Sequence, residues 1–345
     1  MTAESNPVTL LWALRSPCNL GCRYCYFGVI EEHRVAIPQQ SGALSHLART
    51  DLDLAAITAF VHTLPGSRVK RVFIAGGEPL IWPPVMDVIA AIKAAGVQVV
   101  LCTNGIPLNR PHLVDMIIAL GVDGVSVSLD SPDADYNDTW RPARNGKHRH
   151  HDVLSGIQAL IAARGSNPTP RVGLYSVITR LNIDVVRTGA VLASQLGCDY
   201  FVPQPIALDR DHALHTQLSL TGRDAHPMSE AFAQLYRSAA PVRLPDPSYP
   251  GRVVDSITHE QGLVRGCFGG TDLFFIEPDG SVYDCPSSLK IAATATAQNI
   301  RGADARALFA AAGPANSDCA LFSRDCVNMW PLMDFERFLA ERPPT

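Results

Sequence analysis

Three cysteines near the N-terminus are the residues of this chain with the clearest chemical meaning. Cys18, Cys22 and Cys25 form a C-x3-C-x2-C pattern within eight residues, directly after an apolar, β-rich stretch. Three thiolates this close can converge on one ion or one cluster. A zinc site and unrelated structural thiols are the alternatives, but a zinc ribbon needs a second nearby pair and the next cysteine is Cys102. Three cysteines suit a four-iron cluster whose fourth iron stays open for a non-protein ligand.

Four more cysteines lie in the last quarter of the chain, at Cys267, Cys285, Cys319 and Cys326. The first two enclose Pro278-Asp279-Gly280, a hairpin signature, in a C-x12-G-x4-C pattern. Two separated pairs suit a tetrahedral zinc site, and four thiolates also suit a second iron–sulfur cluster. Cys102 and Cys198 lie beside predicted strands, where cysteine is often a small buried hydrophobe, so we expect both to be structural.

The elements that position these cysteines follow from hydrophobic periodicity in the first 205 residues. The six predicted strands are 8–14, 71–74, 97–101, 125–129, 171–178 and 199–202. The five predicted helices are 51–64 (with Asp51 as cap), 84–95, 110–120, 151–163 and 183–196. This alternation predicts an α/β fold of repeated βαβ units around a parallel sheet, either flat or barrel-like. In both forms, chemistry collects at the carboxyl ends of the strands.

The pattern changes after about residue 207. Residues 209–262 are predicted to be mostly irregular, with one helix at 229–238. A hairpin is predicted from 273–277 and 281–283, and helices at 304–312 and 329–339. We therefore divide the chain into a core domain over 1–205, a linker over 206–262 and a C-terminal domain over 263–345.

Composition excludes several classes of protein. Apolar residues make up 47% of the chain and charged residues 18%, so disorder and coiled coil are excluded. The net charge of −4 gives no global field that would attract nucleic acid. The N-terminus lacks a signal-peptide pattern, and no apolar run approaches the roughly 20 residues that span a bilayer. We expect a cytoplasmic protein without a membrane or nucleic-acid partner, whose clustered cysteines bind metal or do redox chemistry.

The first cysteine motif resembles the signature of the radical S-adenosylmethionine (SAM) superfamily, C-x3-C-x-aromatic-C, with Tyr24 as the aromatic residue. The resemblance implies a partial (βα)6 TIM-like barrel that holds a 4Fe-4S cluster and SAM. It also implies that the open iron chelates the amino and carboxylate groups of SAM. An electron then splits the sulfonium, and a 5′-deoxyadenosyl radical removes a substrate hydrogen. A low-potential donor such as flavodoxin or ferredoxin would supply that electron.

Further positions match this superfamily in order along the chain. The implied SAM-binding residues are Tyr24, Tyr26, Gly76, Gly77, Glu78, Pro79, Thr103, Asn104, Ser128, Asp130 and Arg141. In the Gly-Gly-Glu-Pro segment, glycines let backbone approach a ligand, and a carboxylate satisfies the SAM ammonium. Ser128 and Asp130 match the element near the ribose and the SAM carboxylate, while Tyr24 and the Tyr26 backbone would face adenine. A plain turn at Thr103-Asn104 and a surface position for Arg141 are the alternatives.

The C-terminal hairpin resembles the SPASM/twitch extension of the same superfamily. The full SPASM version carries seven cysteines and two auxiliary clusters. The four cysteines Cys267, Cys285, Cys319 and Cys326 imply the shorter twitch type, a β-hairpin plus helix domain with one auxiliary 4Fe-4S cluster. The Cys319-x6-Cys326 spacing departs from the usual pattern.

Two substrate classes remain open: a small polar metabolite and a ribosomally made peptide. About seven residues precede the first strand and the linker lacks a winged-helix pattern, which favours the small molecule over a peptide read by a leader-binding domain. The 10–34 segment and the single-cluster layout most resemble the cytosylglucuronic acid decarboxylases of peptidyl-nucleoside antibiotic pathways. Under that resemblance, a radical at sugar C4′ leads to loss of the C5′ carboxylate, and an electron and a proton reach the product carbon. Dehydrogenation of an aminocyclitol is the other small-molecule alternative.

An anionic substrate of this kind needs cationic partners. The basic segment contains Arg141, Arg144, Lys147, His148, Arg149, His150 and His151. We expect one or two of its side chains to bind the substrate carboxylate, against the alternative of a solvated loop. Glu31 and Glu32, with His33, closely follow the cluster loop and are candidates for touching the sugar or moving a proton.

Overall fold

The computed structural model describes residues 6–25, 51–208, 210, 212–238, 242–259, 264–287, 298–310, 317–322 and 324–340. The predicted roles of Tyr26, Glu31 and Glu32 lie outside these residues. The chain divides into two compact units. Unit 1 contains Met1–Cys18, Cys25–Leu101 and Gly262–Ser323, and unit 2 contains Asn19–Tyr24, Cys102–Gln261 and Arg324–Thr345. This grouping differs from the predicted three-part division, which stays a prediction.

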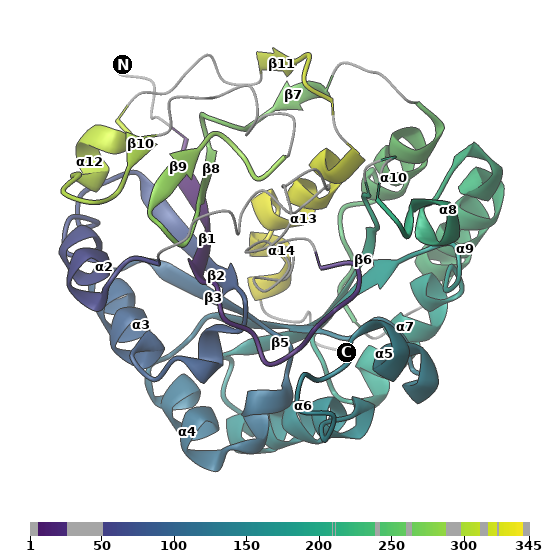
Figure 1. Ribbon diagram of the computed structural model, residues 1–345, viewed down its shortest axis with the longest axis horizontal. Coiled ribbons are helices and arrows are strands. Elements are labelled where there is room, and N and C mark those ends of the chain that lie inside the picture. Colours follow the sequence, from purple (N-terminus) through teal and green to yellow (C-terminus); the bar gives the residue numbers. More distant parts are fainter. Residues whose placement is uncertain are drawn as a thin grey trace. The chain divides into compact units, whose positions relative to one another are not determined.

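Unit 1 is built on a mixed sheet in the strand order β10-β9-β8-β1-β2-β3 (Figure 1). The strands are β1 (Val8–Arg15), β2 (Val69–Gly76), β3 (Gln98–Thr103), β8 (Leu273–Ile276), β9 (Ser281–Tyr283) and β10 (Gln298–Asn299). β1 runs parallel to both β2 and β8, whereas β8 and β9 form an antiparallel hairpin. The predicted first three strands and the predicted hairpin are confirmed.

Helices cover one face of this sheet, and aromatic side chains of the strands pack against aromatic side chains of the helices. The helical elements of unit 1 are α2 (Leu54–Val61), η2 (Pro79–Ile81), α3 (Val85–Ala94) and α12 (Ala305–Leu308). Trp12 of β1 meets Phe60 of α2 edge-on at 5.8 Å between ring centroids, and Phe60 lies 6.5 Å from Phe309. Phe274 of β8 lies 4.9 Å from Phe309 as well. The even-numbered positions of β1 and β8 therefore face the helices, and the odd-numbered ones face the opposite side.

Asp51 does not cap α2, contrary to the prediction from its position. Asp53 is the cap, and its carboxylate accepts a hydrogen bond from the Ala56 amide at 2.7 Å. Asp51 instead accepts a hydrogen bond from the Ser16 amide at 3.0 Å and forms an ion pair with Arg15 at 3.2 Å. The carboxylate thus supports the chain just before Cys18, a role that the helix-start pattern could not distinguish from capping.

Unit 2 contains three parallel strands in the order β4-β5-β6. The strands are β4 (Gly124–Ser128), β5 (Arg171–Ile178) and β6 (Tyr200–Pro205). Its first helical elements are η3 (Ile106–Asn109), α4 (Pro111–Ala119), α5 (Ala134–Trp140), α6 (His150–Arg164) and α7 (Val185–Gln195). Strand–helix alternation confirms the predicted α/β class with a parallel sheet. The sequence did not predict α5, whose seven residues are too few to show a clear period.

The predicted irregular segment 209–262 is in fact largely helical. It contains α8 (His215–Leu218), η4 (Gly222–Asp224), α9 (Ala225–Arg237) and α10 (Tyr249–Thr258). Phe232 of α9 packs edge-on against Tyr249 of α10, and the Tyr249 hydroxyl donates a hydrogen bond to the Pro203 carbonyl of β6 at 2.9 Å. The predicted helix at 229–238 is confirmed as α9, but the prediction that the rest of the segment is irregular was wrong. Pro250 sits in the first turn of α10, where proline is tolerated.

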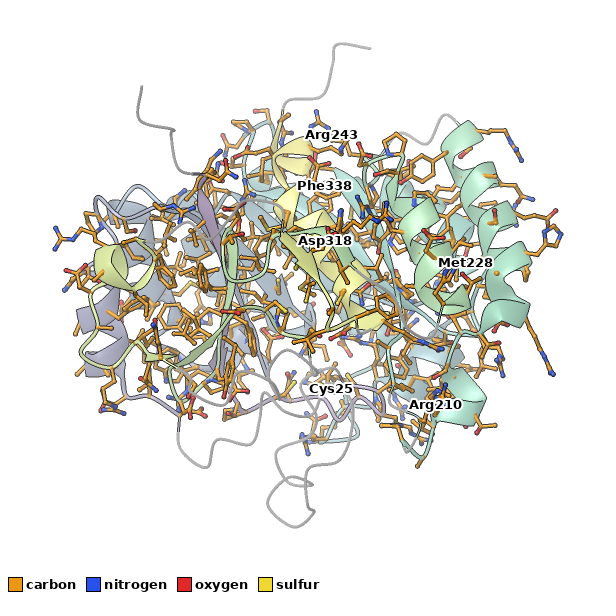
Figure 2. All side chains as sticks on the ribbon, turned by 90° about the horizontal axis from the view of Figure 1, so that it is seen from above. Cys25, Arg210, Met228, Arg243, Asp318 and Phe338 are labelled. Atoms are coloured by element: carbon orange, nitrogen blue, oxygen red, sulfur yellow. The ribbon has the colours of Figure 1, made fainter. Side chains whose placement is uncertain are left out.

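The C-terminal residues pack on the last strand of unit 2. They form η5 (Arg324–Met329), α13 (Trp330–Met333) and α14 (Glu336–Leu339), so the predicted single helix over 329–339 is interrupted near Asp334. Phe338, labelled in Figure 2, lies 4.9 Å from the ring of Tyr200, and Phe335 lies 5.5 Å from it. This aromatic cluster ties the C-terminus to β6.

No helix within the described parts of the chain combines the length and apolar character needed to cross a bilayer.

Candidate active site

The loop that carries Cys22 is held by the segment that follows α5. The Gly21 amide donates to the Pro142 carbonyl at 2.8 Å, and the Arg23 amide donates to the Trp140 carbonyl at 2.9 Å. The Arg144 amide closes the ladder on the Asn19 carbonyl at 3.0 Å. Backbone hydrogen bonds therefore join the cysteine loop directly to the start of the basic segment within unit 2.

The three cysteines of the motif are partly exposed and form no disulfide. Burial raises the pKa of the Cys22 thiol, although the nearby Arg141 lowers it in part. A thiolate at this position therefore needs a further cation beside it, which is what an iron ion supplies. Within the described residues, no three His, Cys, Asp or Glu side chains gather closely enough around one point to hold a single ion. A four-iron cluster is wider than one ion and its thiolates bind separate irons, so the three cysteines stay the predicted ligands of the first cluster.

The two glycines at the end of β2, Gly76 within the strand and Gly77 directly after it, are required by a close backbone approach. The Gly77 amide donates to the Arg15 carbonyl at 2.7 Å, and a Cβ added at Gly77 would lie 2.1 Å from the Pro17 carbonyl oxygen. Gly76 has φ +123°, and its added Cβ would lie 2.4 Å from the Arg15 carbonyl oxygen. From the sequence, these glycines were predicted to let the backbone approach a ligand closely. In unit 1 they also let the end of β2 lie against the chain that leads to Cys18.

Glu78 and Pro79 begin the short helix η2. The Glu78 amide donates to the Pro17 carbonyl at 2.9 Å, which continues the contact made by the glycines. The Glu78 carboxylate accepts a hydrogen bond from the Leu80 amide at 3.1 Å, and the residue is only 1% exposed. A buried carboxylate at the end of a parallel strand fits the predicted partner of an ammonium group.

Asp130 is the centre of a buried network after β4. Its Oδ2 accepts hydrogen bonds from the Tyr24 hydroxyl at 2.7 Å and from Arg141 Nη1 at 3.0 Å. Its Oδ1 accepts from the Val177 amide at 2.8 Å, and Asp130 is fully buried. The alternative of a surface Arg141 is wrong, because its side chain is only 14% exposed.

Electrostatics keep the partners of Asp130 in their donor forms. Burial and the Asp130 charge raise the pKa of Tyr24 well above its usual range, so the phenol stays protonated. Burial alone would lower the pKa of Arg141, but Asp130 outweighs it and the guanidinium stays charged. The aromatic residue of the cysteine motif is thus anchored through its hydroxyl to the Ser-x-Asp element.

The Thr103-Asn104 turn is also connected to the cysteine loop. The Asn104 side-chain amide donates to the Asn19 side-chain carbonyl at 2.7 Å. Thr103 Oγ1 accepts from the Gly105 amide at 3.1 Å, and Asn104 Oδ1 accepts from the Ile106 amide at 3.1 Å. Thr103 and Asn104 therefore form a turn, as the alternative interpretation of the sequence held. The turn also positions the Asn19 side chain.

A pocket in unit 2 joins the predicted SAM residues to the basic segment. Its lining includes Ser128, Arg141, His148, Arg149 and His150. The imidazole Nε2 of His150 is buried and has no hydrogen-bond partner among the described residues. Burial lowers the pKa of His150, so this ring is uncharged at neutral pH. The cations of the lining are Arg141, paired with Asp130 at 3.0 Å, and Arg149, which lies 3.9 Å from the Asp138 carboxylate.

Asp130→Asn is expected to destabilise the protein strongly. The amide cannot balance the charge of Arg141, and breaking a buried ion pair on one side costs about 3–5 kcal/mol. Asp135, exposed on α5, gives the control substitution Asp135→Asn, for which we expect about 0.5 kcal/mol or less. Denaturant unfolding under anaerobic conditions measures both free energies, and equal values would contradict the role of Asp130.

Three of the four later cysteines belong to unit 1. Strands β7 (Val264–Cys267) and β11 (Ser317–Cys319) pair antiparallel, with Ser317 opposite Cys267. The Gly269 amide donates to the Cys267 sulfur at 3.4 Å, and a Cβ added at Gly269 would lie 3.3 Å from the Cβ of Cys285. Gly269 thus lies between two predicted ligands in a space where a larger side chain would crowd both. Cys326 lies in η5, which belongs to unit 2.

Glu277 is a candidate functional residue that the sequence analysis did not single out. It is 4% exposed, and its Oε1 has no hydrogen-bond partner in the described part of the chain. Burial, aided by the Asp279 charge, raises the pKa of Glu277 from 4.5 to about 8. The sequence contained a signal for this residue. In the predicted strand 273–277, Glu277 lies on the same face as Leu273 and Phe275, which should face a core.

Glu277→Gln is expected to change the pH dependence of stability. Because the folded-state pKa is raised, the wild type is stabilised in its protonated form and loses that stability as pH rises from about 4.5 to about 8. The full loss is on the order of 5 kcal/mol at most. A glutamine side chain does not titrate, so the difference in unfolding free energy between the Glu277→Gln variant and the wild type should grow from pH 5.5 to pH 8.5. A difference independent of pH would contradict a buried neutral carboxyl.

Comparisons with known proteins agree with this geometry. The family model of the radical SAM superfamily matches residues 17–187. The AdoMet-dependent heme synthase of Methanosarcina barkeri is 25% identical over 297 residues, which cover 83% of this chain and 78% of that protein. The mycofactocin maturase MftC of Mycobacterium tuberculosis is 27% identical over 299 residues, which cover 82% of this chain and 65% of MftC. This chain therefore spans just under two thirds of the length of MftC.

Solved structures show the same fold. Streptococcus suis SuiB bound to its precursor peptide SuiA has a TM-score of 0.63 at 14% identity, with 88% of this chain and 65% of SuiB covered. anSMEcpe bound to AdoMet and a peptide has a TM-score of 0.63 at 16% identity, with 88% and 80% covered. Together with the match over 17–187, the fold and the motif positions identify the chain as a member of the radical SAM superfamily. The expected 4Fe-4S cluster and SAM follow from that membership.

Proposed function

We propose that this radical SAM enzyme acts on a carboxylate-bearing sugar nucleoside and decarboxylates cytosylglucuronic acid in antibiotic biosynthesis. One observation supports an anionic substrate above the others. The backbone of the basic segment is hydrogen-bonded to the cysteine loop. The Arg144 amide donates to the Asn19 carbonyl, and the Gly21 amide donates to the Pro142 carbonyl. The backbone of the basic segment therefore runs beside the loop that would hold the reactive cluster, and its cationic side chains would bind a carboxylate there.

Different residues of the chain would bind the cluster, SAM and the substrate. When bound, the cluster and SAM supply a 5′-deoxyadenosyl radical that can remove one hydrogen atom from a substrate. Cys18, Cys22 and Cys25 would hold the cluster, and Glu78 would bind the SAM ammonium. Asp130 holds Tyr24 and Arg141 in place, and Ser128 lines the adjoining pocket. Glu31 and Glu32 remain proposed contacts of the sugar, and the Tyr26 backbone a proposed contact of adenine.

We assign the later cysteines to one auxiliary 4Fe-4S cluster of the twitch type. The pairing of β7 with β11 and the position of Gly269 beside Cys267 and Cys285 support a shared site. Cys319 and Cys326 would complete it. Such a cluster would pass an electron between a flavodoxin or ferredoxin and the substrate, which the decarboxylation needs after hydrogen removal.

Maturation of a ribosomally made peptide is the second candidate. The relatives favour it, since MftC is named a maturase and SuiB is solved with a precursor peptide. The same basic segment would then face acidic side chains of a peptide. The basic segment does not favour dehydrogenation of an aminocyclitol, because an aminocyclitol is positively charged and cationic side chains would repel it.

Arg149→Gln tests the proposed substrate. Arg149 lines the pocket and its side chain is 56% exposed, so its removal should leave the fold intact. We expect CO2 release from cytosylglucuronic acid to fall roughly tenfold or more, because a charge-assisted hydrogen bond is lost, while 5′-deoxyadenosine still forms. Arg187→Gln, an exposed arginine on α7, is the matched control. Turnover of a short peptide but not of cytosylglucuronic acid by the wild type would select the peptide candidate instead.

A further inference from the structure

The pocket beside the basic segment is a feature of unit 2 alone. Its lining includes Leu20 of the cysteine loop, Ser128 at the end of β4 and Val153 of α6. Arg149 and His150, where α6 begins, also line it. Every residue that lines the pocket belongs to unit 2, so whatever it binds is held by this unit.

His150 places a hydrogen-bond acceptor in this pocket. The residue is 8% exposed, and its Nε2 has no hydrogen-bond partner in the part of the chain that the structure describes. Burial lowers the pKa of His150 more than the Asp138 charge and a hydrogen bond with the Ser131 backbone raise it, so the ring is neutral. Because that hydrogen bond favours the protonated ring, the ring is its donor and the Ser131 carbonyl its acceptor. Nδ1 therefore carries the hydrogen, and Nε2 keeps a lone pair.

The lone pair of Nε2 needs a donor, because a buried polar atom without a partner destabilises a fold. The two arginines of the lining are turned to carboxylates instead: Arg141 pairs with Asp130 at 3.0 Å, and Arg149 lies 3.9 Å from Asp138. A carboxylate has no hydrogen to donate, so neutral His150 is unsuited to the carboxylate binding expected for the basic segment. A hydroxyl or an N–H group of a ligand would fit it.

We propose that His150 Nε2 accepts a hydrogen bond from a hydroxyl group of the substrate, while Arg149 binds the carboxylate of the same molecule. This inference rests on the proposed function and deepens it, because the pocket would then recognise a hydroxy acid, as a sugar acid is. A site built to bond a hydroxyl discriminates strongly against an analogue that lacks it, since its buried acceptor is then left unpaired. His150 binds the substrate and takes part in no covalent step.

Asparagine and glutamine separate the two ring nitrogens of His150. The side-chain amide of His150→Asn lies near the former Nδ1 and can still donate to Ser131, but no atom reaches the former Nε2. The longer side chain of His150→Gln brings a carbonyl acceptor to the former Nε2 and loses the bond to Ser131. We therefore expect binding and stability to change in opposite directions in the two variants.

The measurement is the Kd for cytosylglucuronic acid, in the cluster-loaded enzyme with SAM and without reductant. We expect His150→Asn to raise this Kd roughly tenfold or more, and His150→Gln to stay within about threefold of the wild type. The Kd for SAM should not change in either variant. His150→Asn should unfold near the wild-type temperature and His150→Gln below it. If the asparagine variant does not fold, His150→Phe keeps a ring without either nitrogen for the same measurement.

His226→Asn, at an exposed histidine of α9, is the matched control and should bind as the wild type does. A wild type that cleaves SAM but neither binds nor decarboxylates cytosylglucuronic acid overturns the proposed function and this inference with it. Wild-type turnover with an unchanged Kd for cytosylglucuronic acid in His150→Asn overturns the inference alone. In that case a raised Kd for SAM assigns the hydroxyl to the SAM ribose, and an unchanged one leaves only an ordered water at Nε2.

Discussion

Substituting alanine for Cys18, Cys22 or Cys25 should abolish formation of 5′-deoxyadenosine by the reduced enzyme. Each change removes one of only three thiolates available to the first cluster, so the cluster is lost or cannot be reduced productively. We expect a loss of about 10³-fold or more, down to the limit of detection by mass spectrometry. Iron and sulfide content should fall by one four-iron cluster in the same preparations.

Cys198→Ala is the matched control for these variants. Cys198 is fully buried and lies just before β6, outside both cysteine groups. Its loss should cost stability by about 1 kcal/mol, as for a small core truncation, and should leave iron content and SAM cleavage unchanged. Retention of full SAM cleavage in the Cys22→Ala variant would contradict the assignment of the first motif.

Gly77→Ala is the second substitution with a large expected effect. The new methyl group would lie 2.1 Å from the Pro17 carbonyl oxygen and 2.4 Å from the Ser16 carbonyl oxygen, and backbone atoms cannot rotate away. The end of β2 and the chain leading to Cys18 must therefore separate. A displacement of about 1 Å in a reacting group costs about 10²-fold in rate, and we expect at least this loss in 5′-deoxyadenosine formation.

Gly251→Ala controls for the general effect of adding a methyl group. Gly251 lies in the first turns of α10, and no atom would come within 4 Å of its added Cβ. Alanine stabilises a helix relative to glycine by about 0.5–1 kcal/mol, so this variant should be fully active and slightly more stable. Similar activity in the Gly77→Ala and Gly251→Ala variants would show that the close approach in unit 1 is not needed for SAM cleavage.

The repeated strands and the motifs at their ends could be predicted from the sequence because their signals are local. Short apolar runs, each followed by a helical stretch, predicted β1 to β6. The spacing of the cysteines predicted the first cluster loop. Segment 209–262 was predicted only in part: the helix at 229–238 corresponds to α9, whereas the four-residue α8 is too short to show a period and α10 has a proline in its first turn.

The connections between motif residues could not be predicted, because they depend on tertiary contacts. Nothing local indicates that the Tyr24 hydroxyl reaches Asp130, or that Asn104 reaches Asn19. The same holds for Asp51, whose pattern as a helix cap is as good as that of Asp53. The cost of burying Glu277 without a partner also became visible only when the neighbouring strands were placed around it.

Transfer of a labelled hydrogen tests the central claim most directly. The cluster-loaded enzyme is reduced without oxygen and supplied with SAM and cytosylglucuronic acid that carries deuterium at sugar C4′. We expect one deuterium atom in the 5′-deoxyadenosine, seen by mass spectrometry, together with release of CO2. Formation of 5′-deoxyadenosine without deuterium and without CO2, by a protein with intact clusters, would contradict the proposed reaction.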